Sequence, residues 1–388
     1  MRAEIYETLD SIPEELWDAV APPDFFFTRA FLRVMENSGV ENAGYRYVVL
    51  RVDDEPVGLA VLSRFRLRLD LLADDRWVTR MRRVAPRLFD VTIVCCGVPA
   101  SLGQHHLHVV RPELKQAALG RVHLCMEAWA EQSKASLLIF KEHSEDQGVG
   151  DIARAMGYVA VPTLPDHSLP ALPATEAEYV GSMRSSYRRK YKAAIALMQG
   201  PGPAWTSGPL RLEEAPFTHQ AADEFLVGYL ALMERAAARL ELYTPGFFHG
   251  LVDSTLDTRQ LRLSNTENGE TLIALMIACG DVLTFALVAK DHAEYEDALY
   301  AVLLRCIALY AIRGGFTQVR LGQTSGYAKV AMGARPRRLE AYIRVRGRLR
   351  QEGLKRFGPS LFPEERSPEL SVFKESADVP PGVGQDPG

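Results

Sequence analysis

Long hydrophobic runs are absent from this chain of 388 residues, and none reaches the roughly 18 to 20 residues that a membrane-spanning helix needs. The first twenty residues, MRAEIYETLDSIPEELWDAV, are acidic and polar, so they also lack the apolar core of a signal peptide. We therefore expect a cytoplasmic protein with no membrane partner.

Cysteine is scarce, and the five cysteines show no CxxC spacing. We expect buried, reduced thiols rather than disulfides or zinc ligands. The histidines of the HHLH stretch, His105, His106 and His108, have no cysteine or carboxylate placed beside them by spacing. Histidines so placed rarely converge on a metal without such a partner, so no metal site is predicted.

An excess of positive charge is also missing, because 45 basic residues face 49 acidic ones and the net charge is −4. This balance gives no general attraction to polyanions, and we expect no duplex DNA partner. There is no GxSxG elbow and no Ser/His/Asp or Cys/His set. A covalent intermediate on the enzyme is therefore not expected.

Two halves of the chain present similar orders of expected elements, judged from β-branched runs between turn residues and from helical apolar spacing. In the first half, helices are expected at residues 25–39, 112–132 and 148–158, and strands at 45–52, 57–67, 91–98 and 136–140. In the second half, helices are expected at 177–200, 217–240, 245–255 and 295–315, and strands at 260–264, 271–279, 282–290, 316–321 and 339–346.

A strand meander followed by alternating helices and strands, occurring twice, predicts an α/β (α+β) protein with two mixed sheets flanked by helices. We expect a first domain at residues 1–174 and a second at 175–358. Residues 359–388 are rich in Pro, Glu and Ser, so a disordered tail is expected there.

The stretch AEYEDALYAVLLRCIALYAIRGGFTQVRLGQTSGYAKVAMGARPRRLEAYIRVR, residues 293–346, resembles the second domain of Fem-type peptidyltransferases and of double-GNAT acyltransferases, a group with BioF2-like acetyltransferase domains. The first half adds FFFTRAFL and IARAMGYVAVP, and MRSSYRRKYKAA resembles the basic helix that opens the family's second domain. The resemblance extends over roughly residues 20–350 and implies tandem GNAT-like domains.

The resemblance implies an N-acyltransferase that forms an amide bond, without a tightly bound cofactor, on the amine of a small acceptor. Fem proteins take an aminoacyl group from aminoacyl-tRNA, whereas ordinary GNAT enzymes take an acyl group from acyl-CoA. Both donors stay open, and so does a catalytically silent double-GNAT protein that only binds a ligand. A tRNA partner follows only from the first alternative.

The loop LGQTSGYAKVAMGA, residues 321–334, matches the loop in which the family carries a lysine, here Lys329. Such a lysine could bind a donor phosphate or stabilise the oxyanion of the tetrahedral intermediate. A solvated surface lysine is the alternative. Lys329 and Tyr327 are the catalytic candidates, and Gln323 is a candidate for substrate binding.

Basic and aromatic residues supply the other candidates for substrate binding. In the helix around residue 187, arginines four apart share one face and could grip phosphates bidentately, although a solvated basic face is the alternative. On the strand at 339–346 the arginines alternate, so Arg344, Arg346 and Arg348 should project to one face. The candidates are Arg184, Tyr187, Arg188, Arg189, Tyr243, Tyr300 and Arg344.

The donor prediction rests on a missing motif. A conventional GNAT enzyme binds the CoA pyrophosphate on a glycine-rich loop at a helix start, but the segment here, KDHAEYEDALY, has no glycine. Its carboxylates Glu294, Glu296 and Asp297 would compete with an anion for the helix dipole. We therefore favour aminoacyl-tRNA over acyl-CoA. The general base is left open among Glu241, Tyr243, Asp291 and Glu340.

Overall fold

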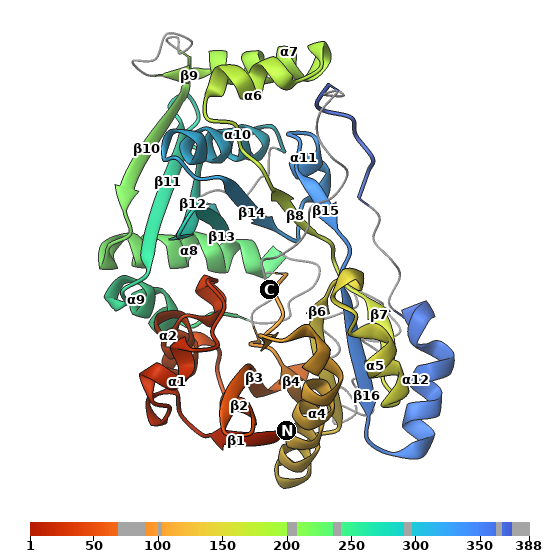
Figure 1. Ribbon diagram of the computed structural model, residues 1–388. Helices are drawn as coiled ribbons and strands as arrows, with labels where there is room; N and C mark the ends of the chain where they lie inside the picture. Colours follow the sequence, from red (N-terminus) through yellow and green to blue (C-terminus); the bar gives the residue numbers. More distant parts are fainter. Residues whose placement is uncertain are drawn as a thin grey trace, which may run out of the picture.

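The computed structural model describes residues 1–68, 90–99, 103–199, 208–235, 242–290, 297–361 and 367–374. Two β-sheets lie one above the other in Figure 1, each with helices packed on it, and the chain begins in the lower domain. The two mixed sheets flanked by helices confirm the fold class predicted from the sequence.

The first sheet contains one parallel contact, between β4 and β6, and its other contacts are antiparallel. Its strands run in the order β1 (Arg2–Tyr6), β2 (Gly44–Val52), β3 (Glu55–Arg68), β4 (Asp90–Cys96), β6 (Leu137–His143), β16 (Glu340–Val345) and β7 (Val159–Pro162), with β5 (Leu107–Val109) paired to β3. The hairpin between β2 and β3 turns at Asp53 and Asp54, which both have positive φ.

Helices α4 (Lys115–Ser133) and α5 (Gly150–Ala155) cover one face of this sheet. The opposite face of β2 and β3 packs against short N-terminal helices and, across them, against the second domain. These helices are η1 (Leu9–Ser11), α1 (Glu14–Asp18), η2 (Phe25–Phe27), α2 (Arg29–Val34) and the π-helical turn η3 (Met35–Gly39). The single helix expected at residues 25–39 is therefore divided into three short helical elements.

The second sheet continues on the far side of this packing. Its strands run in the order β15 (Arg335–Arg337), β8 (Asp166–Leu169), β14 (Gln318–Gly322), β13 (Val282–Lys290), β12 (Thr271–Cys279), β11 (Asp257–Asn265), β10 (Leu210–Pro216) and β9 (Met198–Gln199). Helices α8 (His219–Arg235) and α9 (Pro245–Asp253) lie on the side facing the first domain, and α10 (Asp297–Arg313) lies on the other (Figure 1).

An aromatic core joins the two domains. Phe25, Phe26 and Phe31 of the N-terminal helices share one cluster of buried side chains with Phe225 of α8 and Phe248 of α9. Val61 of the first sheet and Leu275 of the second belong to the same cluster. Because burying an apolar side chain contributes about 1.5–3 kcal/mol, this shared core ties the domains firmly together.

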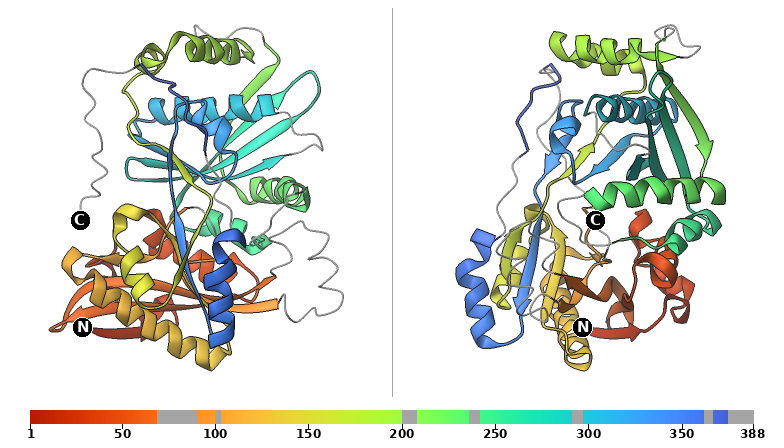
Figure 2. Two further views of the ribbon diagram at one scale, coloured as in Figure 1. Left: turned by 90° about the vertical axis from the view of Figure 1, so that its right-hand side faces the viewer. Right: turned by 180° about the vertical axis from the view of Figure 1, so that it is seen from behind.

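Each sheet also contains one strand from the other half of the chain. The strand expected at residues 339–346, as part of the second half, is β16, and it lies between β6 and β7 of the first sheet. Conversely, β8 leaves the first half and inserts between β14 and β15. Figure 2 shows these two crossing segments side by side between the domains. Tyr342 of β16 is fully buried against Phe140 and Tyr158, which explains why this strand stays in the first sheet.

Three further expectations need correction. The helix expected at 177–200 is broken into α6 (Glu176–Ser182) and α7 (Ser185–Ala196), because Met183 is extended and forms a β-bridge with Phe373. The segment 367–374 is therefore packed against the second domain, and α12 (Arg348–Leu361) extends beyond residue 359. The expectation of a disordered tail from residue 359 onward is wrong for these two stretches. Arg348 begins α12 and cannot continue a row of arginines on β16.

Candidate active site

Strands β13 and β14 run parallel but stay together for only three residue pairs, Val282–Thr284 with Gln318–Arg320. Beyond these pairs β13 carries a bulge at Ala286, because Leu275 of β12 pairs with Leu287 while Met276 pairs with Phe285. A bulge bends its strand and increases the local twist. The two strands therefore diverge, and the carboxyl end of β14 leads into the loop that carries Lys329.

Lys329 lies on the short helix α11 (Gly326–Val330), and only 1% of it is exposed. Its Nζ donates a hydrogen bond of 3.1 Å to the carbonyl oxygen of Gly322. Gly322 has φ +72°, a backbone conformation that favours glycine. Within the described residues this carbonyl is the one hydrogen-bond acceptor for Nζ. An ammonium group has three N–H donors, so two are left for a ligand.

The solvated surface lysine considered as an alternative is therefore wrong. Burial disfavours the ammonium form and lowers the pKa of Lys329 to about 7, although the nearby charge of Asp166 opposes this shift. A lysine held near neutrality in this way exists in both protonation states at physiological pH, which is a property of functional sites more often than of surfaces.

Asp166 is the first residue of β8, and its charge acts on Lys329 without a direct ion pair between the two side chains. It is 3% exposed, and burial raises the pKa of its carboxyl to about 6 against the opposing charges of Arg337, Arg320 and Lys329. Its Oδ2 lies 3.4 Å from Arg337 Nη2, whereas its Oδ1 has no hydrogen-bond partner in the described part of the chain. A buried oxygen without a partner is costly, so Oδ1 is an available acceptor.

His167 completes the arrangement. Burial lowers the pKa of its ring to about 4, so the imidazole is neutral near pH 7. Its Nδ1 lies 3.1 Å from the Gly322 carbonyl oxygen and its Nε2 lies 3.0 Å from Ser367 Oγ. Because a carbonyl only accepts, Nδ1 must carry the proton and Nε2 must accept from Ser367. Gly322 thus receives hydrogen bonds from both Lys329 and His167.

Chemically, the site offers a buried cation with free donors and, on β8, a buried carboxylate whose Oδ1 has no hydrogen-bond partner among the described residues. The first can stabilise a developing oxyanion, and the second can accept a hydrogen bond from an amine. Because both pKa values lie near neutrality, either group could also exchange a proton with the attacking amine.

Of the residues predicted from the sequence, Gln323 directly follows Gly322, whose carbonyl oxygen accepts the hydrogen bond from Lys329. Its Nε2 donates a hydrogen bond of 2.8 Å to the carbonyl oxygen of Leu164, which lies just before β8. Tyr327 lies two residues before Lys329 on α11, and it is 67% exposed. Residues two apart on a helix do not face each other. The structure therefore does not bring the Tyr327 hydroxyl to the buried Lys329 cluster.

The arginines predicted on α7 form a separate surface at the outer side of the second domain (Figure 1). Arg188 and Tyr187 are half-buried and Arg189 is exposed, with Lys190 Nζ lying 5.7 Å from the Tyr187 ring. Arg184 Nε donates to the carbonyl oxygen of Phe373. Arg184 also lines a cavity of about 370 Å³ together with Val330 of α11 and the segment Pro368–Phe373.

The remaining candidates lie elsewhere. Tyr300 is buried in the second domain with its ring centre 6.5 Å from that of Phe285, next to the bulge in β13. Tyr243 is stacked on Phe247 in the aromatic core between the domains. Arg344 lies in the first sheet, where its Nη1 is 3.1 Å from Glu127 and 2.9 Å from His123 on α4. The structure therefore separates Tyr243 and Arg344 from the Lys329 loop.

Two candidates for the general base, Glu241 and Asp291, lie outside the described residues. So do Glu294 and Glu296, the carboxylates expected to compete with an anion at the helix start. Glu340 accepts a hydrogen bond of 2.6 Å from Tyr342 within β16. Asp166 and His167 were missed, because PDHSLP reads as a proline-bounded loop with no strand alternation. Their signal was the two ionisable side chains inside a segment otherwise poor in charge.

Among the described residues, no group of three or more His, Cys, Asp or Glu side chains is placed to hold a metal ion. The rings of His105 and His143 are tilted by 34° with their centres 4.9 Å apart, and His105 lies within hydrogen-bond distance of Gln147. Among the described helices, none combines the length and the apolar character needed to cross a bilayer.

Comparisons with known proteins identify the fold. No family model matches the sequence, and no curated protein matches it. The structure of FemX is similar with a TM-score of 0.56 and 12% identity, over 92% of this chain and 100% of that one. A tandem GNAT protein from the clavulanic acid biosynthesis pathway gives 0.56 and 13%, over 89% and 99%. The chain therefore has the tandem fold of FemX and the tandem GNAT proteins, as its sequence predicts.

Proposed function

We propose that the protein is an N-acyltransferase in which Lys329 and Asp166 bring an activated acyl group and an amine together. The observation that carries this proposal is the buried Lys329 ammonium with two free N–H donors at the carboxyl end of the diverging strands β13 and β14. The tandem GNAT fold supports acyl transfer as the reaction.

In this proposal the two free donors of Lys329 bind the acyl carbonyl oxygen, which becomes an oxyanion when the amine attacks. Donors held in a buried site stabilise such a charge strongly, because no reorganisation is needed at the moment of reaction. Asp166 Oδ1 accepts a hydrogen bond from the acceptor amine and holds it beside the carbonyl carbon. The amine attacks that carbon and gives its proton to Asp166. The tetrahedral intermediate then collapses as the bond between the carbonyl carbon and the donor breaks, and the leaving group takes up a proton.

For the donor we propose an aminoacyl-tRNA, with acyl-CoA as the competing choice. The similarity to FemX supports an aminoacyl-tRNA donor. The similarity to a tandem GNAT protein whose structure was solved without AcCoA supports acyl-CoA as the alternative donor. The surface of α7 around Arg188 and Arg189 supports a polyanionic donor, because arginine binds phosphate bidentately. A cytoplasmic location is part of this proposal.

The test supplies the protein with charged tRNA and with acyl-CoA in parallel, together with a panel of small amines, and detects amide products by mass spectrometry. Amide formation that depends on charged tRNA and is abolished by RNase is the expected result. Products formed from the CoA thioester alone, with no effect of RNase, would overturn the donor. Absence of any amide product from either donor would count against acyl transfer.

Two variants test the site itself. Lys329→Met keeps the volume of the side chain but removes its donors, and we expect a loss of about 10²- to 10³-fold in kcat, since one oxyanion donor is typically worth this much. Asp166→Asn should raise KM for the amine more than it lowers kcat. Lys355→Ala, in the exposed part of α12, is the matched control and should leave both constants unchanged. A loss of less than tenfold for Lys329→Met would exclude the electrostatic role.

A further inference from the structure

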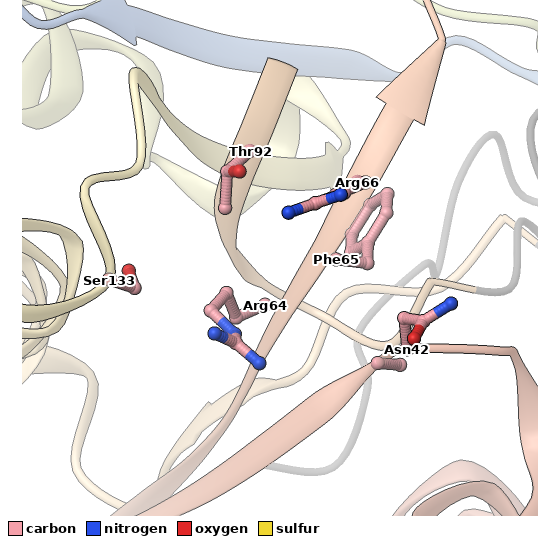
Figure 3. A pocket seen from close by; sticks show the side chains of 7 residues that line it. Asn42, Arg64, Phe65, Arg66, Thr92 and Ser133 are labelled. Atoms are coloured by element: carbon pink, nitrogen blue, oxygen red, sulfur yellow. The ribbon is translucent and has the colours of Figure 1, made fainter. Parts of the chain in front are cut away.

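A second polar cavity lies in the first domain, with a volume of about 390 Å³. It opens between β3, β4 and the end of α4, as Figure 3 shows. Its lining residues are Asn42, Ala43, Arg64, Phe65, Arg66, Thr92 and Ser133. None of them belongs to the Lys329 site, so the inference below does not depend on the proposed reaction.

Two arginines define the chemistry of this cavity. Arg64 and Arg66 are two apart on β3 and therefore project to the same face of the sheet. Arg66 pairs in register with Thr92 of β4, and Figure 3 shows its guanidinium extending toward that residue. Arg64 pairs with Gly44 of β2, which carries no side chain, so Nη2 of Arg64 occupies the space above that glycine.

Neither guanidinium is neutralised within the described residues, where Arg64 and Arg66 form no hydrogen bond or ion pair. Among the described residues that line the cavity there is no carboxylate. Other arginines of the same domain are paired with carboxylates, namely Arg2, Arg33, Arg46 and Arg51. Two uncompensated arginines on one cavity wall create a positive potential that favours an anion.

The size and lining of the cavity indicate which class of anion it can hold. The volume falls within the range of small-molecule sites and exceeds what one inorganic phosphate fills. The Thr92 hydroxyl and the Asn42 amide add hydrogen-bonding groups to the N–H donors of the two guanidinium groups. We propose that this cavity binds a small phosphate monoester, with Arg64 and Arg66 holding the phosphate group.

Isothermal titration of the full chain at low salt with AMP tests the proposal, with adenosine and inorganic phosphate as comparison probes. We expect saturable binding of AMP at one site, no binding of adenosine, and phosphate binding at least tenfold weaker than AMP. Raising the salt concentration should weaken AMP binding, because the interaction is electrostatic.

The variant Arg64→Gln/Arg66→Gln should weaken AMP binding at least tenfold, and Thr92→Val should weaken it several-fold. The control Arg33→Gln/Arg154→Gln removes two arginines outside the cavity lining and should bind AMP as the wild type does. An unchanged affinity in the Arg64/Arg66 variant, or no binding of AMP to the wild type at millimolar concentration, would overturn the proposal. Equal affinity for phosphate and AMP would overturn the assignment to a monoester.

Discussion

At the scale of single residues, Lys329 makes the stability of the protein depend on pH. Its pKa is about 7 in the folded protein and 10.5 in its ordinary state, so between these values the unfolded chain binds more protons. Stability should therefore rise with pH in this window, by up to about 1.4 kcal/mol per pH unit from this group.

The comparison of wild type with Lys329→Met isolates this contribution, because methionine does not titrate. Urea unfolding at pH 7, 8 and 9 should show the wild type gaining free energy of unfolding relative to the variant at each step. Asp166, with a pKa of about 6, is largely ionised throughout and adds little to the slope. Parallel curves for the two proteins would mean that Lys329 keeps an ordinary pKa.

The sequence could indicate the position of Lys329 but not its environment. Lysine is almost never buried without a partner, so local patterns favour a surface position for it. Its environment includes Asp166 and His167, which lie some 160 residues earlier and belong to the second sheet only because β8 crosses into it. Such a contact between distant segments leaves no periodic signal in either one.

At the scale of secondary-structure elements, two helical glycines should respond in opposite directions to alanine. A Cβ at Gly228 of α8 would lie 2.9 Å from both backbone atoms N and O of Lys290, so Gly228→Ala should destabilise by about 1–3 kcal/mol. A Cβ at Gly120 of α4 meets nothing within 4 Å, so Gly120→Ala should stabilise by about 1 kcal/mol. Thermal unfolding of both variants checks this pair, and a stabilising Gly228→Ala would show that α8 can move away from β13.

The segment 367–374 should protect the Lys329 cluster. Ser367 is hydrogen-bonded to His167, Val372 is buried, and the Phe373 ring packs so closely on Gly333 that a Cβ there would clash with it. A chain ending at residue 366 should therefore unfold at a lower temperature, and Lys329 should become more reactive toward an amine-modifying reagent, as peptide mass mapping would show.

A chain ending at residue 374 is the matched control for this truncation. It retains Ser367, Val372 and Phe373 and should match the full chain in both measurements. If both truncations behave alike, the segment does not cover the site.

Elements that rest on local patterns were predictable. The hairpin of β2 and β3, the long helix α4 and the meander of β11, β12 and β13 appear close to where apolar periodicity and turn residues place them. The break at Met183 was not predictable, because it depends on the β-bridge to Phe373, 190 residues later. The short strands β8 and β15 likewise depend on pairing across the sheet rather than on their own three or four residues.

At the scale of the whole molecule, the exchanged strands and the shared aromatic core should make the two domains unfold together. The fragment 1–174 lacks β16, which pairs with both β6 and β7, and it lacks α8 and α9. We expect this fragment alone to show no cooperative thermal transition. Co-expression with the fragment 175–388 should restore one, and a cooperative transition in 1–174 alone would contradict the coupling.

The exchange of β8 and β16 also sets an order of events during translation. The first sheet cannot be closed until residue 345 has left the ribosome, although most of its strands emerge before residue 170. At about 5–20 residues per second, β6 and β7 must wait many seconds with a gap between them. The nascent chain thus exposes two unpaired strand edges for almost half of its synthesis, and such edges invite pairing with other chains.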